Sequence, residues 1–366
     1  MTIAVQEAVG DIGRVWLPIE VGKLQLPHRL AMAPMTRSRA KPDGTPGDLA
    51  PLYYAQRATM GLLISEGTQP SEDGQGYLAT PGSYTDEHVA GWKKVAEAVH
   101  DAGGRLFLQL MHVGRVSHPA NTPHHRQPVA PSAIAPDASM FTMQGTLSIP
   151  EPRALTTVEV KQTVADFAAA ARRAVEAGAD GVEVHGANGY LVHQFLAPNA
   201  NQRSDEYGGS MQNRARFAVE VVRAIADAIG PEKTAIRLSP GIPTNGIAEG
   251  AENDDLYRYL AAEFGRSGLA YLHVLHVRSD AFLAELRKAF AGVLIVNRPG
   301  RQREQIGSDV AAGLADLESL GVLTLSNPDL VDRLKSRAAF NEVRPQLFYA
   351  GGGAEGYTDY PSLDRS

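Results

Sequence analysis

Short apolar runs and longer segments with helical periodicity alternate along almost the whole chain. This alternation predicts parallel strands joined by crossover helices, and eight such repeats close naturally into one barrel. Seven of the runs are clear, whereas the eighth is weaker because Glu318 lies inside it. The predicted strands are Arg29–Ala33, Leu62–Glu66, Arg105–Leu110, Gly181–His185, Ala235–Ser239, Tyr271–Leu275, Val293–Val296 and Ala315–Leu320. The sequence therefore predicts an α/β protein, a single (β/α)8 TIM barrel domain over residues 1–366.

The helices between these strands are marked by their ends. Glycine follows each apolar periodic segment closely, which is a typical signal for the C-terminus of a helix. Thr156 and Glu159 also mark the beginning of one helix, because a Thr followed three residues later by Glu is a typical N-terminal pattern. The predicted helices are Glu87–Ala102, Thr157–Ala177, Asn213–Ile229 and Asp254–Arg266.

Two segments do not follow the alternation. Val116–Pro152, after the third strand, is rich in Pro, Ser and His and poor in helix formers. Long loops after barrel strands lie on the C-terminal face and are usually functional, so we expect 116–152 to form a capping region over the mouth. Residues 350–366 form a Gly-rich C-terminal tail that contains Tyr357 and Tyr360.

Charge and composition exclude several classes of function. The net charge is −6 and the basic residues do not cluster, so no nucleic acid or membrane partner is expected. The chain has no cysteine, which excludes disulfides, thiolate metal sites and a Cys nucleophile, and no metal site is predicted. Residues 1–15 lack a signal-peptide pattern and no apolar stretch is long enough to cross a bilayer. We expect a cytoplasmic enzyme with a small-molecule substrate; the sequence does not predict its oligomeric state.

The end of the fourth predicted strand carries the most informative residues. His185 and Asn188 lie three apart on a turn that contains Gly186 and Gly189. Two converging neutral donors at the mouth of a barrel can polarise a carbonyl or nitro oxygen. The phenol of Tyr190 is protonated at neutral pH and can deliver a proton to a carbanion. The ordinary alternative is that His185 is a structural hydrogen bonder and Tyr190 a rim residue.

Other polar residues near strand ends suit an anionic planar cofactor. Arg237 lies in an apolar strand and needs a polar or anionic partner, either a cofactor or, alternatively, Glu66 or Glu183. The amide of Gln109 suits an imide edge, although it is also a common core residue. Gly67 would let a ring approach the backbone or would simply serve a turn. Thr36 has an equally ordinary alternative as a helix cap.

Taken together and in order, these motifs resemble the Old Yellow Enzyme family of flavin-dependent ene-reductases, most of all the branch that contains morphinone reductase and pentaerythritol tetranitrate reductase. The resemblance runs from about Leu17 to the tail. It rests on Ala33-Pro34-Met35-Thr36-Arg37, Gln109-Leu110-Met111-His112, Glu183-Val184-His185-Gly186-Ala187-Asn188-Gly189-Tyr190-Leu191, Asn201-Gln202-Arg203, Tyr207-Gly208-Gly209-Ser210 and Gly356-Tyr357-Thr358-Asp359-Tyr360-Pro361.

This resemblance implies an NAD(P)H oxidoreductase with non-covalent FMN, in which NADPH or NADH supplies hydride for an activated alkene. It implies that His185 and Asn188 bind the electron-withdrawing oxygen of the substrate and that Tyr190 protonates the α-carbon. The substrate pocket would also include Tyr77, Met111 and Tyr349. The implied cofactor-binding residues are Pro34, Met35, Thr36, Gly67, Gln109, Arg237, Asn297, Arg298 and Gly321.

The chain departs from the family pattern where the phosphate of FMN is expected. Arg298-Pro299 replaces a Gly-rich turn after strand seven, and Val322 stands where relatives carry an Arg after Gly321. Glu318 adds a negative charge nearby. Arg298, Arg301 or Arg303 would substitute for the missing cation, or alternatively they form a solvated basic loop. The alternative hypothesis is therefore a family descendant with weak or lost FMN binding, which uses the same pocket for flavin-free isomerase or cyclase chemistry or for binding only.

Overall fold

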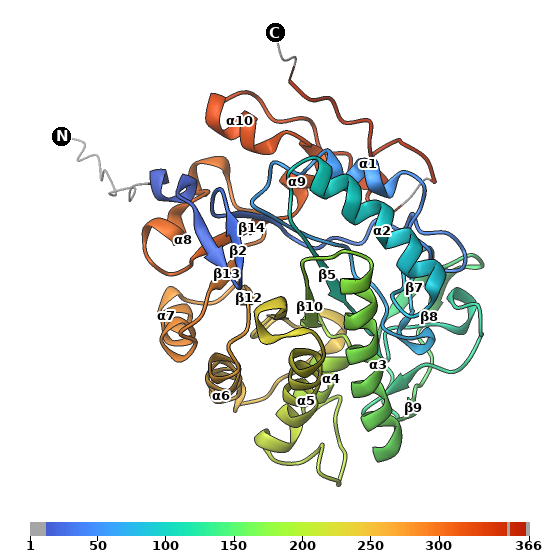
Figure 1. Ribbon diagram of the computed structural model, residues 1–366. Helices are drawn as coiled ribbons and strands as arrows, with labels where there is room; N and C mark the ends of the chain where they lie inside the picture. The colour runs from blue at the N-terminus through green and yellow to red at the C-terminus, as the bar shows by residue number, and fades with distance from the viewer. Residues whose placement is uncertain (1–11, 350–351, 364–366) are drawn as a thin grey trace, which may run out of the picture.

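The computed structural model describes residues 12–349 and 352–363. Eight parallel strands close into a barrel in the order β10-β11-β12-β13-β14-β3-β4-β5, with the longer helices packed around them (Figure 1). The predicted (β/α)8 barrel is confirmed. The barrel strands are β3 Leu30–Met32, β4 Leu62–Ile64, β5 Leu106–Leu110, β10 Gly181–Gly186, β11 Thr234–Leu238, β12 Tyr271–Leu275, β13 Leu294–Asn297 and β14 Leu317–Leu320.

The helices agree with the predicted ones to within two residues at each end. Thr156 and Glu159 form the capping box at the beginning of α3, so the local signal was interpreted correctly. Short helices that the sequence did not reveal follow the strands on the C-terminal side. The helices are α1 Ala50–Ala55, α2 Asp86–Asp101, α3 Thr157–Glu176, α4 Leu191–Leu196, α5 Met211–Ile229, α6 Asn253–Arg266, α7 Asp280–Ala289, α8 Ser308–Ala311, α9 Val322–Ser326 and α10 Leu330–Ser336. None of the described helices is long and apolar enough to cross a membrane.

A small hairpin packs against one end of the barrel. Its strands, β1 (Ile19–Val21) and β2 (Leu24–Leu26), pair antiparallel. Val21 and Leu26 are buried in one apolar cluster with residues of the barrel strands, including Phe107. Because this cluster shields that end from water, the opposite, C-terminal end remains for the functional site.

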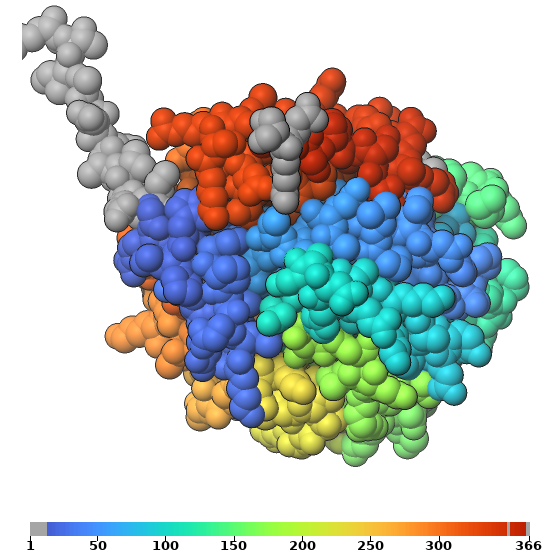
Figure 2. All heavy atoms as spheres, turned by 45° about the horizontal axis from the view of Figure 1, so that its top comes forward, coloured from blue at the N-terminus to red at the C-terminus, as the bar shows by residue number. Residues whose placement is uncertain are grey.

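The C-terminal tail lies against the loop that follows β3. Tyr357 stacks on Tyr53 at 4.2 Å between ring centroids, and the guanidinium of Arg37 donates a hydrogen bond of 2.8 Å to the carbonyl of Gly356. Figure 2 shows the red C-terminal segment beside the blue and light-blue N-terminal third of the chain. The tail therefore holds the segment that leads from β3 into the site.

The segment after β5 contains four short strands that the sequence did not predict. β6 (Val129–Ala130) pairs with β9 (Arg153–Ala154), and β7 (Ser139–Thr142) forms a hairpin with β8 (Gly145–Ser148). Residues of this hairpin line a cavity at the mouth together with Tyr190. The segment thus contributes side chains to this cavity, and its capping role over the mouth stays a prediction.

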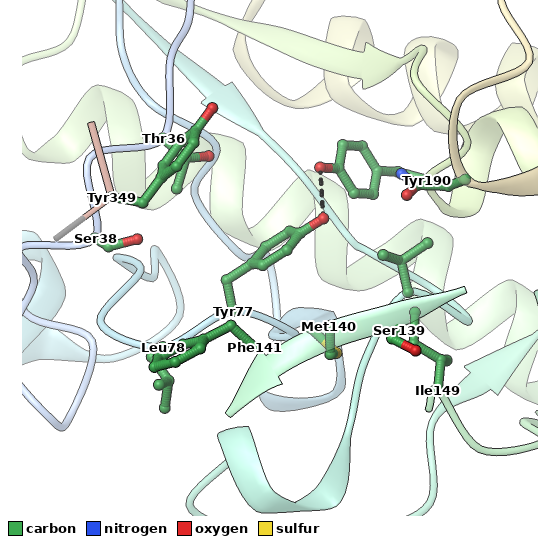
Figure 3. A pocket seen from close by; sticks show the side chains of 12 residues that line it. Thr36, Ser38, Tyr77, Leu78, Ser139, Met140, Phe141, Ile149, Tyr190 and Tyr349 are labelled. Atoms are coloured by element: carbon green, nitrogen blue, oxygen red, sulfur yellow. Dashed lines mark hydrogen bonds between the residues drawn. The ribbon is translucent and has the colours of Figure 1, made fainter. Parts of the chain in front are cut away.

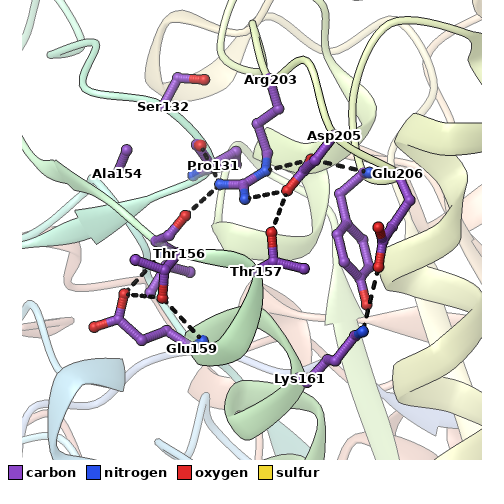
Figure 4. A network of polar contacts seen from close by, with 12 residues as sticks. Pro131, Ser132, Ala154, Thr156, Thr157, Glu159, Lys161, Arg203, Asp205 and Glu206 are labelled. Carbon is purple, nitrogen blue, oxygen red and sulfur yellow. Dashed lines mark hydrogen bonds and ion pairs between the residues drawn. The ribbon is translucent and has the colours of Figure 1, made fainter.

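A polar network anchors the two ends of this segment to the barrel helices (Figure 4). Arg203 donates hydrogen bonds to the carbonyls of Pro131 and Leu155, near β6 and β9. Its guanidinium also pairs with Asp205, which accepts a 2.7 Å hydrogen bond from Thr157 in the first turn of α3. The pairing with Arg203 lowers the pKa of Asp205 well below its usual value. The network thus fixes where the capping segment leaves and rejoins the barrel.

Candidate functional site

The turn after β10 places Asn188 in a left-handed conformation with φ of 55°. This conformation is costly for a residue other than glycine and persists only where its surroundings hold it. The backbone N–H of Asn188 donates to the Ser239 hydroxyl at 2.9 Å, and its carbonyl accepts from the side chain of Asn245 at 2.8 Å. The turn is therefore held on both sides, which leaves the Asn188 side chain free for a ligand.

Glycine is required at the next position. Gly189 has φ of 78°, and a β-carbon there would lie 2.4 Å from the carbonyl oxygen of Thr244. Its N–H donates to Nδ1 of His193 at 3.1 Å, and its carbonyl accepts from the amide of Gln194 at 2.8 Å. Side chains of α4 thus fix both polar groups of this peptide.

His193 in turn belongs to a buried network. Its Nε2 lies 2.7 Å from Glu249, whose carboxylate also accepts hydrogen bonds from the Tyr257 hydroxyl and from the N–H of Gly241 at 2.6 Å. The sequence analysis missed His193, Glu249 and Tyr257, because they are far apart in the chain and nothing in their local pattern indicates a role.

The side chains of Tyr190 and His185 lie side by side beyond this turn. The ring centroids are 5.0 Å apart, and the hydroxyl of Tyr190 is 3.1 Å from that of Tyr77 (Figure 3). Burial raises the pKa of Tyr190 well above its usual value, so the phenol stays protonated. Burial and the charge of Arg237 lower the pKa of His185, so its ring is neutral and carries one N–H donor.

Two cavities that share the lining residue Tyr349 lie at this end of the barrel, and His185 lines neither of them. The first has a volume of about 450 Å³. It is lined by Thr36, Ser38, Tyr77, Leu78, Val116, Ser139, Met140, Phe141, Ile149, Tyr190, Asn245 and Tyr349. The second has a volume of about 840 Å³ and contains Asn188, Arg237 and Tyr349 among its lining residues. Both volumes are typical of ligand sites. The predicted substrate residues Tyr77 and Tyr349 thus line the same cavity as Tyr190, and Met111 belongs to the apolar cluster against which Tyr77 and Tyr190 pack.

Arg237 lines the second cavity and does not form the ion pair that was an alternative prediction from the sequence. Its Nη2 donates to Asn297 at 3.2 Å, and its Nε is buried without a hydrogen-bond partner in the described part of the chain. Glu183 instead contacts Gln109 at 2.7 Å and His273 at 2.8 Å. The alternative in which Arg237 forms an ion pair with Glu66 or Glu183 is therefore wrong, since no salt bridge of Arg237 occurs among the described residues.

The predicted cofactor residues are brought together only in part. The second cavity is lined by six of them: Pro34, Met35, Arg237, Asn297, Arg298 and Gly321. Thr36 lines the first cavity instead and lies in an irregular segment, so its alternative role as a helix cap is wrong. Gln109 and Gly67 line neither cavity. A β-carbon at Gly67 would lie 2.5 Å from Cε of Met111, which covers this glycine.

The basic loop after β13 is largely neutralised by acidic residues. Arg298 pairs with Asp309 and Asp280, and Arg301 pairs with Asp309 and Glu318. Glu318, which is 1% exposed, also accepts hydrogen bonds of 2.8 Å from the N–H groups of Gly307 and Asp309. The carboxylate is therefore compensated, and it does not face the cavity as an unpaired negative charge.

Arg303 differs from these two arginines, because no carboxylate pairs with it in the described residues. Its guanidinium stacks over Phe340 at 3.7 Å and donates to the carbonyl of Ala338, and both Arg303 and Phe340 line the second cavity. The first residues of α9 line the same cavity at the phosphate position typical of TIM barrels. Together with the unpartnered Nε of Arg237, these features fit an anionic, flat cofactor with a phosphate arm.

Comparisons with known proteins agree with this geometry. The model of the NADH:flavin oxidoreductase / NADH oxidase family matches residues 14–341. The 12-oxophytodienoate reductase 1 of Oryza sativa subsp. japonica is 41% identical over 360 residues, which cover 95% of this chain and 92% of that protein. The 12-oxophytodienoate reductase 2 of Arabidopsis thaliana is 40% identical over 360 residues, which cover 95% of this chain and 95% of that protein.

Solved structures show the same relationship. The structure of morphinone reductase matches with a TM-score of 0.92 at 44% identity and covers 96% of both chains. Morphinone reductase in complex with tetrahydroNAD matches with a TM-score of 0.91 at 45% identity, over 96% of this chain and 98% of that one. Fold, motifs and nearly full-length similarity therefore lead to one assignment. The chain belongs to the Old Yellow Enzyme family of NADH:flavin oxidoreductases, enzymes that use FMN together with NADH or NADPH.

Proposed function

We propose that this enzyme reduces the C=C bond of an alkene activated by a carbonyl or nitro group. The observation that carries the proposal is the position of Tyr190. Its protonated phenol is buried beside neutral His185 and lines the first cavity, two residues after Asn188, which lines the second. A proton donor next to two hydrogen-bond donors suits a substrate in which an oxygen takes up negative charge while a nearby carbon is protonated.

His185 and Asn188 bind the activating oxygen of the substrate. Nδ1 of His185 is buried without a partner in the described residues, and the fixed turn presents the Asn188 amide to the same region. A neutral imidazole donates one hydrogen bond but carries no positive charge. It therefore does not stabilise the oxyanion so strongly that the anion itself becomes the ground state. The donors therefore stabilise the charge that develops on the oxygen during reduction.

Tyr190 protonates the α-carbon, and Tyr77 supports it. When FMN is bound, it accepts hydride from the nicotinamide and supplies hydride to the β-carbon of the alkene. Loss of the Tyr190 proton leaves a phenolate, which accepts a hydrogen bond from the Tyr77 hydroxyl 3.1 Å away. Burial also raises the pKa of Tyr77, so this second phenol keeps its own proton.

The residues of the second cavity would hold FMN. Arg237 offers a fixed positive charge to the ring system, and Pro34, Met35 and Gly321 provide an apolar wall. Asn297, Arg298 and Arg303 lie toward the phosphate arm. We retain Thr36, Gln109 and Gly67 as further cofactor contacts. This arrangement favours the flavin-dependent function over the flavin-free alternative, because the buried Nε of Arg237 has no partner among the described residues and an anionic group would supply one.

The test separates the two half-reactions under anaerobic conditions. In Tyr190→Phe, reduction of the flavin by NADPH should stay within about twofold, and reoxidation by 2-cyclohexenone should slow about 10²- to 10⁴-fold, as expected for the loss of a general acid. Tyr259→Phe, on the outer helix α6, is the matched control and should change neither rate. Equal reoxidation rates in Tyr190→Phe and the unmodified enzyme would show that the proton comes from another group.

A further inference from the structure

The described residues that line the first cavity are all uncharged. They include no Asp, Glu, Lys, Arg or His, and most of the side chains are aromatic or aliphatic (Figure 3). It adjoins Tyr190 on one side and the hairpin of β7 and β8 on the other. A substrate whose reacting end lies at Tyr190 therefore has only neutral surroundings for the rest of its body.

Two of the arginines close to this wall, Arg115 and Arg39, donate hydrogen bonds to backbone carbonyls. Arg115, next to the lining residue Val116, donates hydrogen bonds to the carbonyls of Ile134, Asn245 and Gly246 at 3.1–3.3 Å. Arg39, next to Ser38, donates to carbonyls of the C-terminal segment. Neither guanidinium lines the cavity, so a carboxylate on the body of the substrate would lose its hydration without gaining a counter-charge.

The β7–β8 hairpin supplies part of the apolar wall of the cavity, and one of its side chains is exposed to solvent. Met140 is buried and packs with Met111 and Ile149, whereas Phe141 lines the cavity and is still 69% exposed. The carbonyl of Phe141 accepts a 2.9 Å hydrogen bond from Asn121, whose amide also donates to the carbonyl of Gly76, the residue before Tyr77. This link fixes the backbone of the hairpin relative to the segment that carries Tyr77, so Phe141 is attached beside the cavity while its ring stays exposed.

Resting on the function proposed above, we propose that the substrate is a neutral alkene with an apolar body, which lies between Tyr77 and the hairpin and is covered by Phe141. The activating oxygen points to His185 and Asn188, and the body extends toward Met140 and Ile149. Phe141 is then a specificity-determining residue: it buries apolar substrate surface and does not take part in the reduction itself.

The first experiment compares a small and a large substrate with truncation of the hairpin. Phe141→Ala should leave kcat/KM for 2-cyclohexenone within about twofold and lower kcat/KM for 4-phenyl-2-cyclohexenone at least about tenfold, mainly through KM. This magnitude corresponds to the loss of two or three buried methylene equivalents at about fourfold each. Met143→Ala is the matched control, because Met143 lies on the same hairpin, is 79% exposed and does not line the cavity.

The second experiment tests charge. The unmodified enzyme should prefer a 4-substituted cyclohexenone that carries a methyl ester over the matching carboxylate at least about a hundredfold in kcat/KM. Ser139→Lys, which adds a cation to the exposed edge of the wall, should improve the acid and narrow this ratio. A carboxylate that reacts as well as its ester, or an equal loss for both enones in Phe141→Ala, overturns the proposal.

A failure of the proposed reductase function gives a different experimental result from a failure of the cavity assignment. If no enone is reduced at all, the proposed function fails, and the cavity is tested by calorimetric binding of the saturated ketones that correspond to the ester and the acid. Preferential binding of the ester, weakened by Phe141→Ala and unchanged by Met143→Ala, supports the assignment of the cavity even then. Equal binding of acid and ester refutes it.

Discussion

His193 and Glu249 form a buried pair, with Nε2 of the imidazole 2.7 Å from the carboxylate, directly behind the turn that carries Asn188. Because Nδ1 of His193 accepts the hydrogen bond of Gly189, the proton of the neutral ring lies on Nε2 and is donated to Glu249. The pair thus connects the loop after β11, which contains Glu249, to the turn after β10, which contains Gly189. These two segments are about 60 residues apart in the sequence.

Glu249→Gln should weaken this connection. A carboxamide has one acceptor oxygen, whereas Glu249 accepts from His193 and Tyr257 with one oxygen and from Gly241 with the other. We expect the free energy of unfolding to fall by about 1–3 kcal/mol and KM for 2-cyclohexenone to rise more than kcat falls. Denaturant unfolding and steady-state kinetics measure both effects. Glu285→Gln, in an exposed ion pair with Arg258, should change stability by less than about 1 kcal/mol.

Arg237→Met should separate stability from cofactor binding. The buried guanidinium has one 3.2 Å hydrogen bond and an unpartnered Nε, so an apolar side chain of similar length leaves the flavin-free protein equally or more stable. Affinity for FMN should fall about ten- to a hundredfold, as measured by quenching of flavin fluorescence on binding. Arg223→Met, on the exposed face of α5, should leave the affinity unchanged. Unaltered FMN binding in Arg237→Met would contradict the role of this residue as the counter-charge.

Glu318→Gln tests the phosphate end of the cofactor site. The amide can still accept hydrogen bonds from Gly307 or Asp309, but it no longer neutralises Arg301. The loop becomes more positive by one charge, so FMN should bind about three- to tenfold more tightly, while riboflavin, which lacks the phosphate, should bind as before. Thermal unfolding of the flavin-free variant should occur at a lower temperature. An equal change in affinity for both flavins would place the phosphate elsewhere.

His112 should make the protein sensitive to acid. Burial lowers the pKa of His112 to about 4 from 6.5, and its Nδ1 accepts a hydrogen bond from the N–H of Gly114 at 3.1 Å. Between these pKa values the unfolded chain binds more protons than the folded one. The contribution to stability is therefore complete above pH 6.5 and is lost as the pH falls toward 4, up to about 3 kcal/mol.

The variant His112→Asn isolates this contribution. The carboxamide oxygen can accept the same hydrogen bond but does not titrate. The free energy of unfolding of the variant should fall less steeply between pH 6.5 and 4 than that of the unmodified protein. The pH dependence of stability that remains in the variant includes the contribution of His185, because burial also lowers the pKa of that residue. Measurements above pH 7, where neither imidazole titrates, give the fixed cost of the substitution. Parallel curves for the two proteins would show that His112 does not titrate in this range.

Much of the barrel and of the reaction centre could be predicted from the sequence. Periodicity and glycine signals act locally, so strands such as Gly181–Gly186 and helices such as Thr157–Glu176 were predicted within about two residues. His185, Asn188 and Tyr190 could be predicted as a candidate site because they lie close together in the chain at the end of one strand. The hairpins β1–β2 and β7–β8 were missed, because their strands have only three or four residues and depend on the surfaces against which they pack.

The sequence by itself determined the closed barrel and predicted the end at which the candidate site lies, because strand periodicity and the polarity of parallel strands are properties of neighbouring residues. Only the tertiary structure decided the state of the groups at the site. It showed that Arg237 has no ion-pair partner among the described residues, whereas Glu318 does, and that Phe141 lines a cavity whose described lining residues are uncharged. These properties depend on burial and on contacts between residues distant in the chain, and both arise only when the strands are assembled.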